Sequence, residues 1–227
     1  MFNETLETTE TEAGFRCILY GESGYGKTYS LSTIPDTEGV GILSTATEKG
    51  LRHVKKLCPK TRVQSINSSD DMRKAFAWLS ESGHKEFHTL FLDSLTDFAE
   101  IVTAEEKLKS NDPRTIYPNV VNIVFKMLSG MKTIPVNIIY TAHQGVNKMG
   151  VYEPDFPGQQ LGPKAPYWSD AIFAMRMQEI DGVAKRAFQT NSNGEPYKCK
   201  FRGDELNTFE PPNWSEIYKK LGIKTTK

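Results

Sequence analysis

The chain has 227 residues, of which 38% are hydrophobic and 25% charged, which is typical of a soluble globular protein with a sizeable core. The 28 basic and 28 acidic side chains cancel, so any contact with nucleic acid must come from a local patch or from several copies assembled together. The cysteines, Cys17, Cys58 and Cys199, are odd in number and widely spaced, which argues against a disulfide framework or a zinc knuckle and favours a reducing compartment.

The beginning of the chain is acidic and rich in threonine, so it matches neither a signal peptide nor a membrane span, which needs ~20 apolar residues. We expect a flexible acidic leader over residues 1–13, a single domain over residues 14–221 and a basic tail over residues 222–227. The predicted location is the cytoplasm.

Short apolar runs then alternate with amphipathic stretches. The runs predict five strands, at residues 15–20, 40–43, 63–66, 88–93 and 136–141. The stretches between them predict helices that begin near residue 27, cover about 49–57, follow capping residues at 68–71, and cover about 94–109 and 117–132. Strands that alternate with helices indicate a parallel sheet.

The pattern changes after His143, where glycine, proline and glutamine interrupt residues 144–166. Three further short strands are predicted at residues 170–177, 184–190 and 198–201, and a closing helix at about 216–221. We interpret this part as a β-rich C-terminal extension of the same sheet.

A glycine-rich loop joins the first strand to the first helix. Residues 21–28 read GESGYGKT and fit G-x-x-x-x-G-K-[ST], in which glycines let backbone N–H groups point at phosphate oxygens. Lys27 would reach the β- and γ-phosphates, and the Thr28 hydroxyl would bind Mg²⁺. The loop sits between a strand and a helix, which disfavours a merely structural turn. The predicted nucleotide-binding set is Gly21, Glu22, Ser23, Gly24, Tyr25, Gly26, Lys27, Thr28 and Tyr29.

The fourth strand ends in an acid. Residues 90–94 read LFLDS and fit the second nucleotide-binding motif, an apolar strand followed by an aspartate that holds Mg²⁺ through water. The pattern is common, and Asp93 alone could equally cap the next helix. Because a P-loop precedes it, we predict that Thr28 and Asp93 bind the metal.

Polar residues also follow the second and fifth strands. Glu48 lies where a carboxylate could orient or deprotonate the attacking water, although an ordinary acid at a helix N-terminus fits equally well. His143 and Gln144 lie at the carboxyl edge, where open α/β sheets bind ligands. Such a group could sense the γ-phosphate or contact only solvent.

Together these residues resemble the RecA-like ATPases, most closely the short phage-encoded RecA-like nucleotide-binding proteins that include single-strand-annealing recombinases. The resemblance covers about residues 14–221 and implies an α/β RecA-like P-loop NTPase with a mainly parallel central sheet flanked by helices. Its segments are residues 21–28, 44–51 (STATEKGL), 90–94 and 140–144 (YTAHQ), and in the tail Pro157-Gly158, Trp168 before Asp170, Arg176, and PPNW at 211–214.

The resemblance implies roles that position alone leaves open. It implies ATP and Mg²⁺ as cofactors, Glu48 as the catalytic residue that activates water, and Gln144 as the γ-phosphate sensor, with Lys27 completing the catalytic set. The family often carries an aspartate where this chain has Ala46, which leaves the geometry around Glu48 open.

The resemblance also implies a homo-oligomer, a ring or filament with ATP at the subunit junction. In RecA-like assemblies, basic residues of the neighbouring subunit activate ATP hydrolysis. Here the candidates are Lys198, Lys200 and Arg202, unless they only keep a strand edge soluble.

In RecA-like proteins the loop after the fifth strand faces DNA, which here means roughly residues 145–167. Its basic and aromatic residues could neutralise phosphates and stack on bases; they are Lys148, Lys164, Tyr152, Phe156 and Tyr167. Glu153 and Asp155 lie among them, so a structured hairpin that packs on the core is an equal alternative.

Three functions fit these observations. The first is an ATP-dependent phage protein of DNA recombination or single-strand annealing, in the host cytoplasm, with single-stranded DNA as a ligand. The alternative is an ATP-controlled switch or assembly factor that binds a protein partner and not DNA, which neutral charge favours. A small-molecule kinase ranks last, because Arg114 and Arg176 are too isolated to form an arginine-rich lid.

Overall fold

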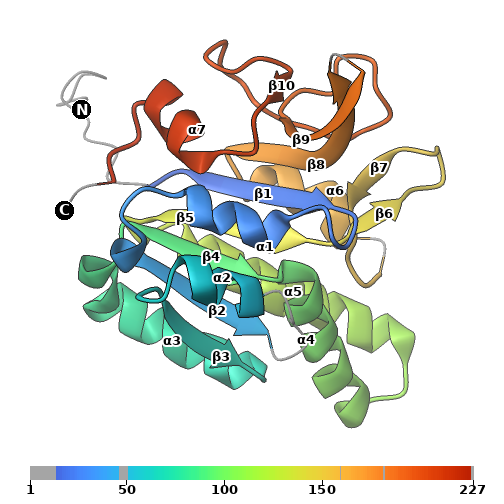
Figure 1. The fold of residues 1–227 in the computed structure, drawn as a ribbon. Coiled ribbons are helices and arrows are strands. Elements are labelled where there is room, and N and C mark those ends of the chain that lie inside the picture. Colours follow the sequence, from blue (N-terminus) through green and yellow to red (C-terminus); the bar gives the residue numbers. More distant parts are fainter. Residues whose placement is uncertain (1–13, 46–50, 159, 181, 226–227) are drawn as a thin grey trace, which may run out of the picture.

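The computed structural model describes residues 14–45, 51–158, 160–180 and 182–225 (Figure 1). The predicted leader and the last two residues of the predicted tail lie outside this description. Within it, no helix is both long and apolar enough to cross a membrane.

An eight-stranded sheet forms the centre of the molecule, in the order β10-β9-β8-β1-β5-β4-β2-β3. The strands from β8 to β3 in this order are parallel, and β9 and β10 continue the sheet antiparallel. Their bounds are β1 (Arg16–Gly21), β2 (Val40–Thr45), β3 (Arg62–Ile66), β4 (Thr89–Asp93), β5 (Asn137–Ala142), β8 (Ala171–Ile180), β9 (Val183–Gln189) and β10 (Phe209–Glu210). The predicted parallel sheet with a β-rich C-terminal extension is confirmed.

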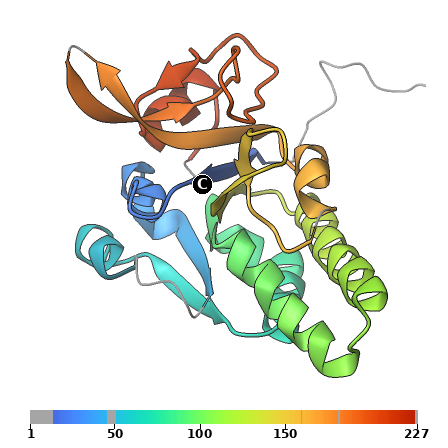
Figure 2. The same cartoon turned by 90° about the vertical axis from the view of Figure 1, so that its right-hand side faces the viewer.

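Helices cover both faces of the sheet, with α1 and α2 on one side and α4 and α5 on the other (Figure 2). Every residue of β1, β2, β4 and β5 is buried, which explains why these strands read as continuous apolar runs. The helices are α1 (Lys27–Ser30), α2 (Leu51–Leu57), α3 (Ser69–Glu81), α4 (Leu95–Lys109), α5 (Pro113–Met131), α6 (Leu161–Lys164) and α7 (Trp214–Lys220).

Two small elements matter for the site. A hairpin of β6 (Gln144–Val146) and β7 (Tyr152–Pro154) projects from the carboxyl end of β5 (Figure 1). Helix α7 returns to the first turn after the P-loop, where the Trp214 indole is fully buried and donates to Ser30 Oγ at 3.0 Å. Short 3₁₀ turns cover Leu31–Thr33, Thr37–Gly39, Gly83–Glu86 and Ala165–Tyr167.

The predicted start of one helix and one predicted strand are wrong. Helix α5 begins at Pro113 rather than near residue 117, because Asp112 caps it and proline suits the first helical position. Residues 198–201 form no strand and instead contribute an isolated bridge between Lys200 and Ile172.

Candidate functional site

The glycine-rich loop leaves the end of β1 and enters α1 as predicted. Gly24 and Gly26 have φ angles of 82° and 102°, in the left-handed region that favours glycine. The amides of Ser23, Gly24 and Gly26 donate no hydrogen bond within the described part of the chain. Backbone N–H groups in such a turn form an anion-binding concavity, so these residues fit a phosphate group.

The side chains of the loop surround this concavity. Lys27 Nζ donates to the carbonyl oxygens of Gly21 at 2.7 Å and Glu22 at 3.1 Å, so its ammonium group lies over the loop. Tyr25 is half-buried, and the Glu22 carboxylate, which accepts a hydrogen bond from its hydroxyl, raises the pKa of Tyr25. Tyr29 is 49% exposed. Of the predicted nucleotide-binding residues, Gly21 is buried at the end of β1, and residues 22–29 follow it as one continuous segment of exposed and half-buried residues.

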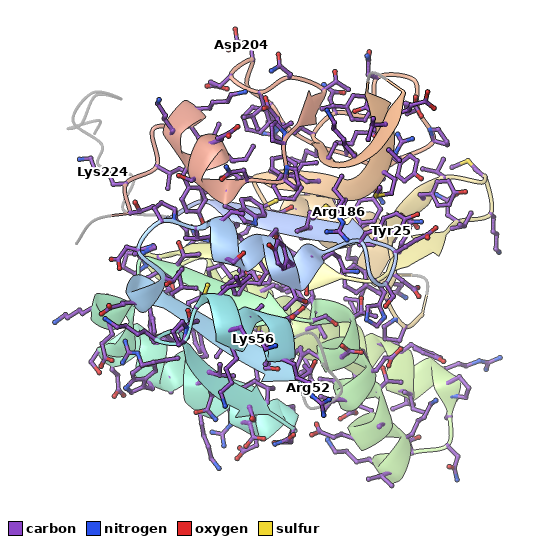
Figure 3. The ribbon with its side chains drawn as sticks, viewed as in Figure 1. Tyr25, Arg52, Lys56, Arg186, Asp204 and Lys224 are labelled. Carbon is purple, nitrogen blue, oxygen red and sulfur yellow. The ribbon has the colours of Figure 1, made fainter. Side chains whose placement is uncertain are left out.

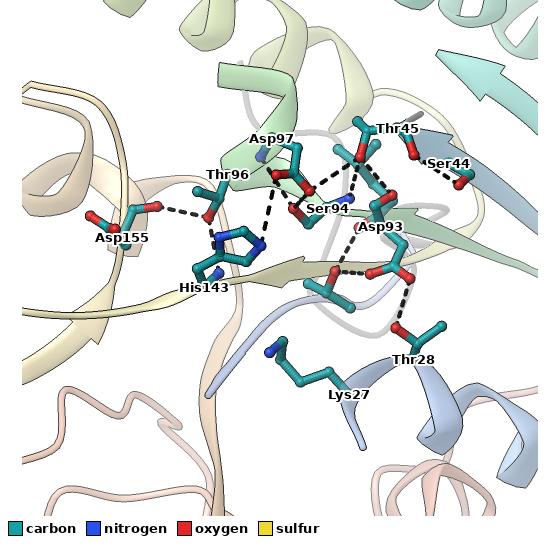
Figure 4. Close-up of polar contacts among 12 residues, drawn as sticks. Lys27, Thr28, Ser44, Thr45, Asp93, Ser94, Thr96, Asp97, His143 and Asp155 are labelled. Carbon is teal, nitrogen blue, oxygen red and sulfur yellow. Dashed lines mark hydrogen bonds and ion pairs between the residues drawn. The ribbon is translucent and has the colours of Figure 1, made fainter. Parts of the chain in front are cut away.

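Asp93 connects the P-loop to two strands of the sheet. It ends β4 and is only 1% exposed. Its Oδ2 accepts from Thr28 Oγ1 at 2.8 Å, and its Oδ1 accepts from the Thr141 hydroxyl on β5 (Figure 4). The two predicted metal-binding residues thus lie in direct contact.

The environment of Asp93 suits a bound cation. Burial raises the pKa of its carboxyl group, an effect that the hydroxyls of Thr141 and Thr28 and the charge of Lys27 oppose. The Thr28 hydroxyl and the Asp93 carboxylate supply oxygen ligands, which Mg²⁺ prefers. The residues present therefore fit this metal.

A second buried acid, Asp97, extends the polar network beyond Asp93. Its Oδ2 accepts from Ser94 Oγ at 2.6 Å and from Thr45 Oγ1 at 3.3 Å. Thr45, at the end of β2, also donates to the Asp93 carbonyl oxygen at 3.1 Å. His143 Nε2 lies 3.8 Å from Asp97 Oδ1 (Figure 4). The ends of β2, β4 and β5 are thereby joined by polar contacts.

Of the predicted catalytic residues Glu48 and Gln144, the structure describes only Gln144. Ala46 and Glu48, one and three residues after Thr45, lie outside the described residues. Gln144 is half-buried and begins β6 directly after His143, at the carboxyl edge as predicted. Their roles stay predictions.

The three basic residues predicted to act on a neighbouring subunit lie in different surroundings. Lys198 Nζ donates to the Glu153 carboxylate at 2.9 Å, and Lys200 Nζ donates to the Pro166 carbonyl oxygen at 2.7 Å. Both ammonium groups thus bind within the chain, whereas Arg202 is exposed.

The segment predicted to face DNA is largely structured. Tyr152 stacks on Tyr197 with ring centroids 4.6 Å apart, and Phe156 is a core residue with 7% exposure. Tyr167 is 75% exposed, but it lines the same hollow as Phe15, which precedes β1, so it lies at the opposite edge of the sheet from the P-loop. The base of the hairpin packs on the core, as in the alternative, whereas Val146 and Met149 at its tip are exposed. Tyr152, Phe156 and Tyr167 form no joint stacking surface.

Sequence reasoning missed Thr141, Asp97 and Thr45 as members of the site. Thr141 and Thr45 are the polar residues closest to the ends of apolar strands, which was the available signal. Asp97 follows Ser94 by three residues, the spacing of a helix cap, and its amide does donate to Ser94 Oγ at 3.1 Å.

The strand order explains how these groups meet. Strand β5 lies between β1, which leads into the P-loop, and β4, which ends at Asp93, so a hydroxyl on β5 reaches the acid that Thr28 contacts. A P-loop and a terminal acid set on this mainly parallel sheet define a P-loop nucleotide triphosphatase.

The comparison with protein families agrees with this class. A family model described as an AAA domain matches residues 13–199, so the chain belongs to this AAA domain family. No curated protein matches it in sequence. Among solved structures, a KaiC-like protein of the hyperthermophilic archaeon Pyrococcus horikoshii OT3 is similar, with a TM-score of 0.47 and 14% identity over 78% of this chain and 77% of that chain.

Proposed function

We propose that the chain binds and hydrolyses Mg-ATP and couples this cycle to single-stranded DNA in recombination or strand annealing of the phage type that its sequence resembles. The amides of the P-loop and Lys27 would hold the phosphates, and Thr28 and Asp93 would hold the metal. Bound Mg²⁺ would neutralise negative charge on the phosphate oxygens. Glu48 would then activate water, and Gln144 would contact the γ-phosphate.

The observation that carries the coupling is the attachment of the β6–β7 hairpin to the site. Thr96 Oγ1 donates to the Asp155 carbonyl oxygen at 2.8 Å and accepts from the His143 amide at 3.0 Å. The Asp155 amide donates to the His143 carbonyl oxygen at 2.9 Å, so both ends of the hairpin are bound at one point. Since the His143 side chain also reaches Asp97, a change around the γ-phosphate can move the hairpin.

The tip of the hairpin supplies the surface for a ligand. Val146 and Met149 are 61% and 84% exposed, and Lys148 lies between them in an exposed position. Aliphatic side chains can insert between bases, while a lysine neutralises a phosphate. The proposed DNA contact is therefore this tip.

The proposed assembly is a ring or filament of one domain, residues 14–221, with ATP at the junction. Activity would rise with protein concentration, since a neighbour completes the site. Of the three basic candidates, Arg202 is the best placed to act on a neighbour, because the ammonium groups of Lys198 and Lys200 are bound within their own chain.

The test is the ATPase rate as a function of protein concentration, with and without single-stranded DNA, at two salt concentrations. We expect stimulation by DNA that falls at high salt and is lost in a Lys148→Ala/Met149→Ala variant. Leu108→Ala is the matched control, because Leu108 is 90% exposed on α4. If ATP binds but the ATPase rate does not change with single-stranded DNA, the DNA role is rejected and a switch that binds a protein partner is favoured.

A further inference from the structure

The β8–β9 hairpin extends past the end of β1 and over the P-loop. Gly21, the last residue of β1, pairs with Met175 on β8, and Met175 pairs with Phe188 on β9. The pair Met177 and Arg186 lies two residues further along the hairpin. Because alternate residues of a strand share a face, Arg186 lies on the same face as Phe188, which packs in the core with Leu31 and Trp214.

Arg186 lies directly against the glycine-rich loop. A Cβ at Gly26 would lie 3.6 Å from Cδ, Nε and Nη1 of Arg186. Nε and Nη1 are atoms of the guanidinium group, so that group itself, and not only the aliphatic stem, lies beside the loop. Figure 3 shows Arg186 reaching down from β9 toward the loop that carries Tyr25.

The guanidinium group has donors to offer at this position. Arg186 is exposed, and within the described part of the chain it forms no hydrogen bond and no ion pair. Arginine carries five N–H donors in a fork that matches phosphate geometry. The neighbouring amides of Gly24 and Gly26 likewise donate no hydrogen bond within the described residues. The N–H donors of the Arg186 guanidinium group and the amides of the glycine-rich loop thus lie side by side.

We propose that Arg186 binds a phosphate oxygen of the nucleotide held by the P-loop of its own chain. The inference rests on the proposed function, because it adds a binding residue to the same ATP site. The competing explanation is a charge that protects an open strand edge, since β10 pairs with β9 only at Phe188 and Gln189. Lys185, on the other face of the same strand, would protect the open edge equally well and is therefore the matched control.

The experiment measures the affinity of the full chain for Mg-ATP and for inorganic tripolyphosphate by calorimetry. Arg186→Ala should weaken both at least about tenfold, Arg186→Lys should recover part of the loss, and Lys185→Ala should stay within about twofold of the wild type. The circular dichroism of each variant without ligand should match the wild type, because both side chains are exposed.

The other outcomes are equally informative. Unchanged binding by Arg186→Ala, or a loss for ATP without a loss for tripolyphosphate, would overturn the phosphate contact. If the wild type bound neither ligand, the proposed ATP function would fail instead. Mixing Arg186→Ala with Lys27→Ala chains should restore no ATP turnover, because both residues serve the same site; recovery would show that Arg186 acts on a neighbour.

Discussion

Asp93→Asn separates the proposed metal-binding role of this carboxylate from its effect on folding. Burial raises the pKa of Asp93, so the folded chain holds the proton more tightly than the unfolded chain, where the pKa of aspartate is about 3.9. The protein therefore loses stability as the pH rises from the pKa of Asp93 in the unfolded chain through its pKa in the folded chain. At neutral pH the ionised carboxylate lowers the free energy of unfolding. Asparagine is uncharged and keeps an oxygen for the Thr141 hydroxyl, so the ligand-free variant should be at least as stable as the wild type at neutral pH.

The expected loss of ligand stabilisation can be worked out. Removing a charged partner costs about 1.5–3 kcal/mol, or roughly 10- to 150-fold in affinity. Mg-ATP at about 100 times its Kd stabilises the wild type by about 2.7 kcal/mol, and a hundredfold weaker site leaves about 0.4 kcal/mol. At about 2–4 °C per kcal/mol for a chain of this size, the rise in Tm falls from about 5–11 °C to about 1 °C.

The assay is thermal unfolding at neutral pH with and without Mg-ATP, with EDTA added to a parallel sample. Glu106→Gln is the control: Glu106 is buried in α4, and its hydrogen bond from Lys109 lowers its pKa, so its loss should destabilise the protein without changing the ligand-induced rise. A full rise in Tm for Asp93→Asn would refute the metal role. A marked fall in the ligand-free Tm would refute the burial argument.

Three further substitutions test other parts of the molecule. Lys27→Ala should abolish ATP binding or turnover with an unchanged circular dichroism spectrum, and wild-type ATPase would reject the P-loop assignment. Glu48→Gln should keep ATP binding in calorimetry and lose turnover, whereas loss of binding would indicate a structural role. Trp214→Ala removes a fully buried ring and should lower the free energy of unfolding in urea by about 3–5 kcal/mol; a loss under 1 kcal/mol would contradict the packing of α7 on the P-loop helix.

The parts of the site that depend on local backbone geometry were predictable from the sequence. Gly24 and Gly26 have positive φ angles, which few other residues adopt, so the loop must show glycine at these positions. The strands were predictable for a similar reason, because burial on both faces demands continuous apolar runs. Local requirements of this kind leave a pattern in one short segment.

Contacts that depend on strand order left no such pattern. Thr141 meets Asp93 only because β5 lies beside β4, and the two residues are 48 positions apart in the chain. The predicted strand at 198–201 failed for a related reason. Its apolar and basic alternation fits a strand, yet Lys200 pairs with Ile172 by a single bridge and binds its ammonium group to a carbonyl oxygen of another segment.

The cost of burying Asp93 also bears on how the site works. The hydroxyls of Thr28 and Thr141 satisfy both carboxylate oxygens without supplying a positive charge, and burial still dominates the pKa. A bound cation would remove this cost at the point where β1, β4 and β5 end side by side. Because His143 and the hairpin are attached to the end of β5, the groups that gain from the metal are linked to those proposed to contact DNA. Ligand binding and hairpin position should therefore be coupled in both directions, since linkage is reciprocal.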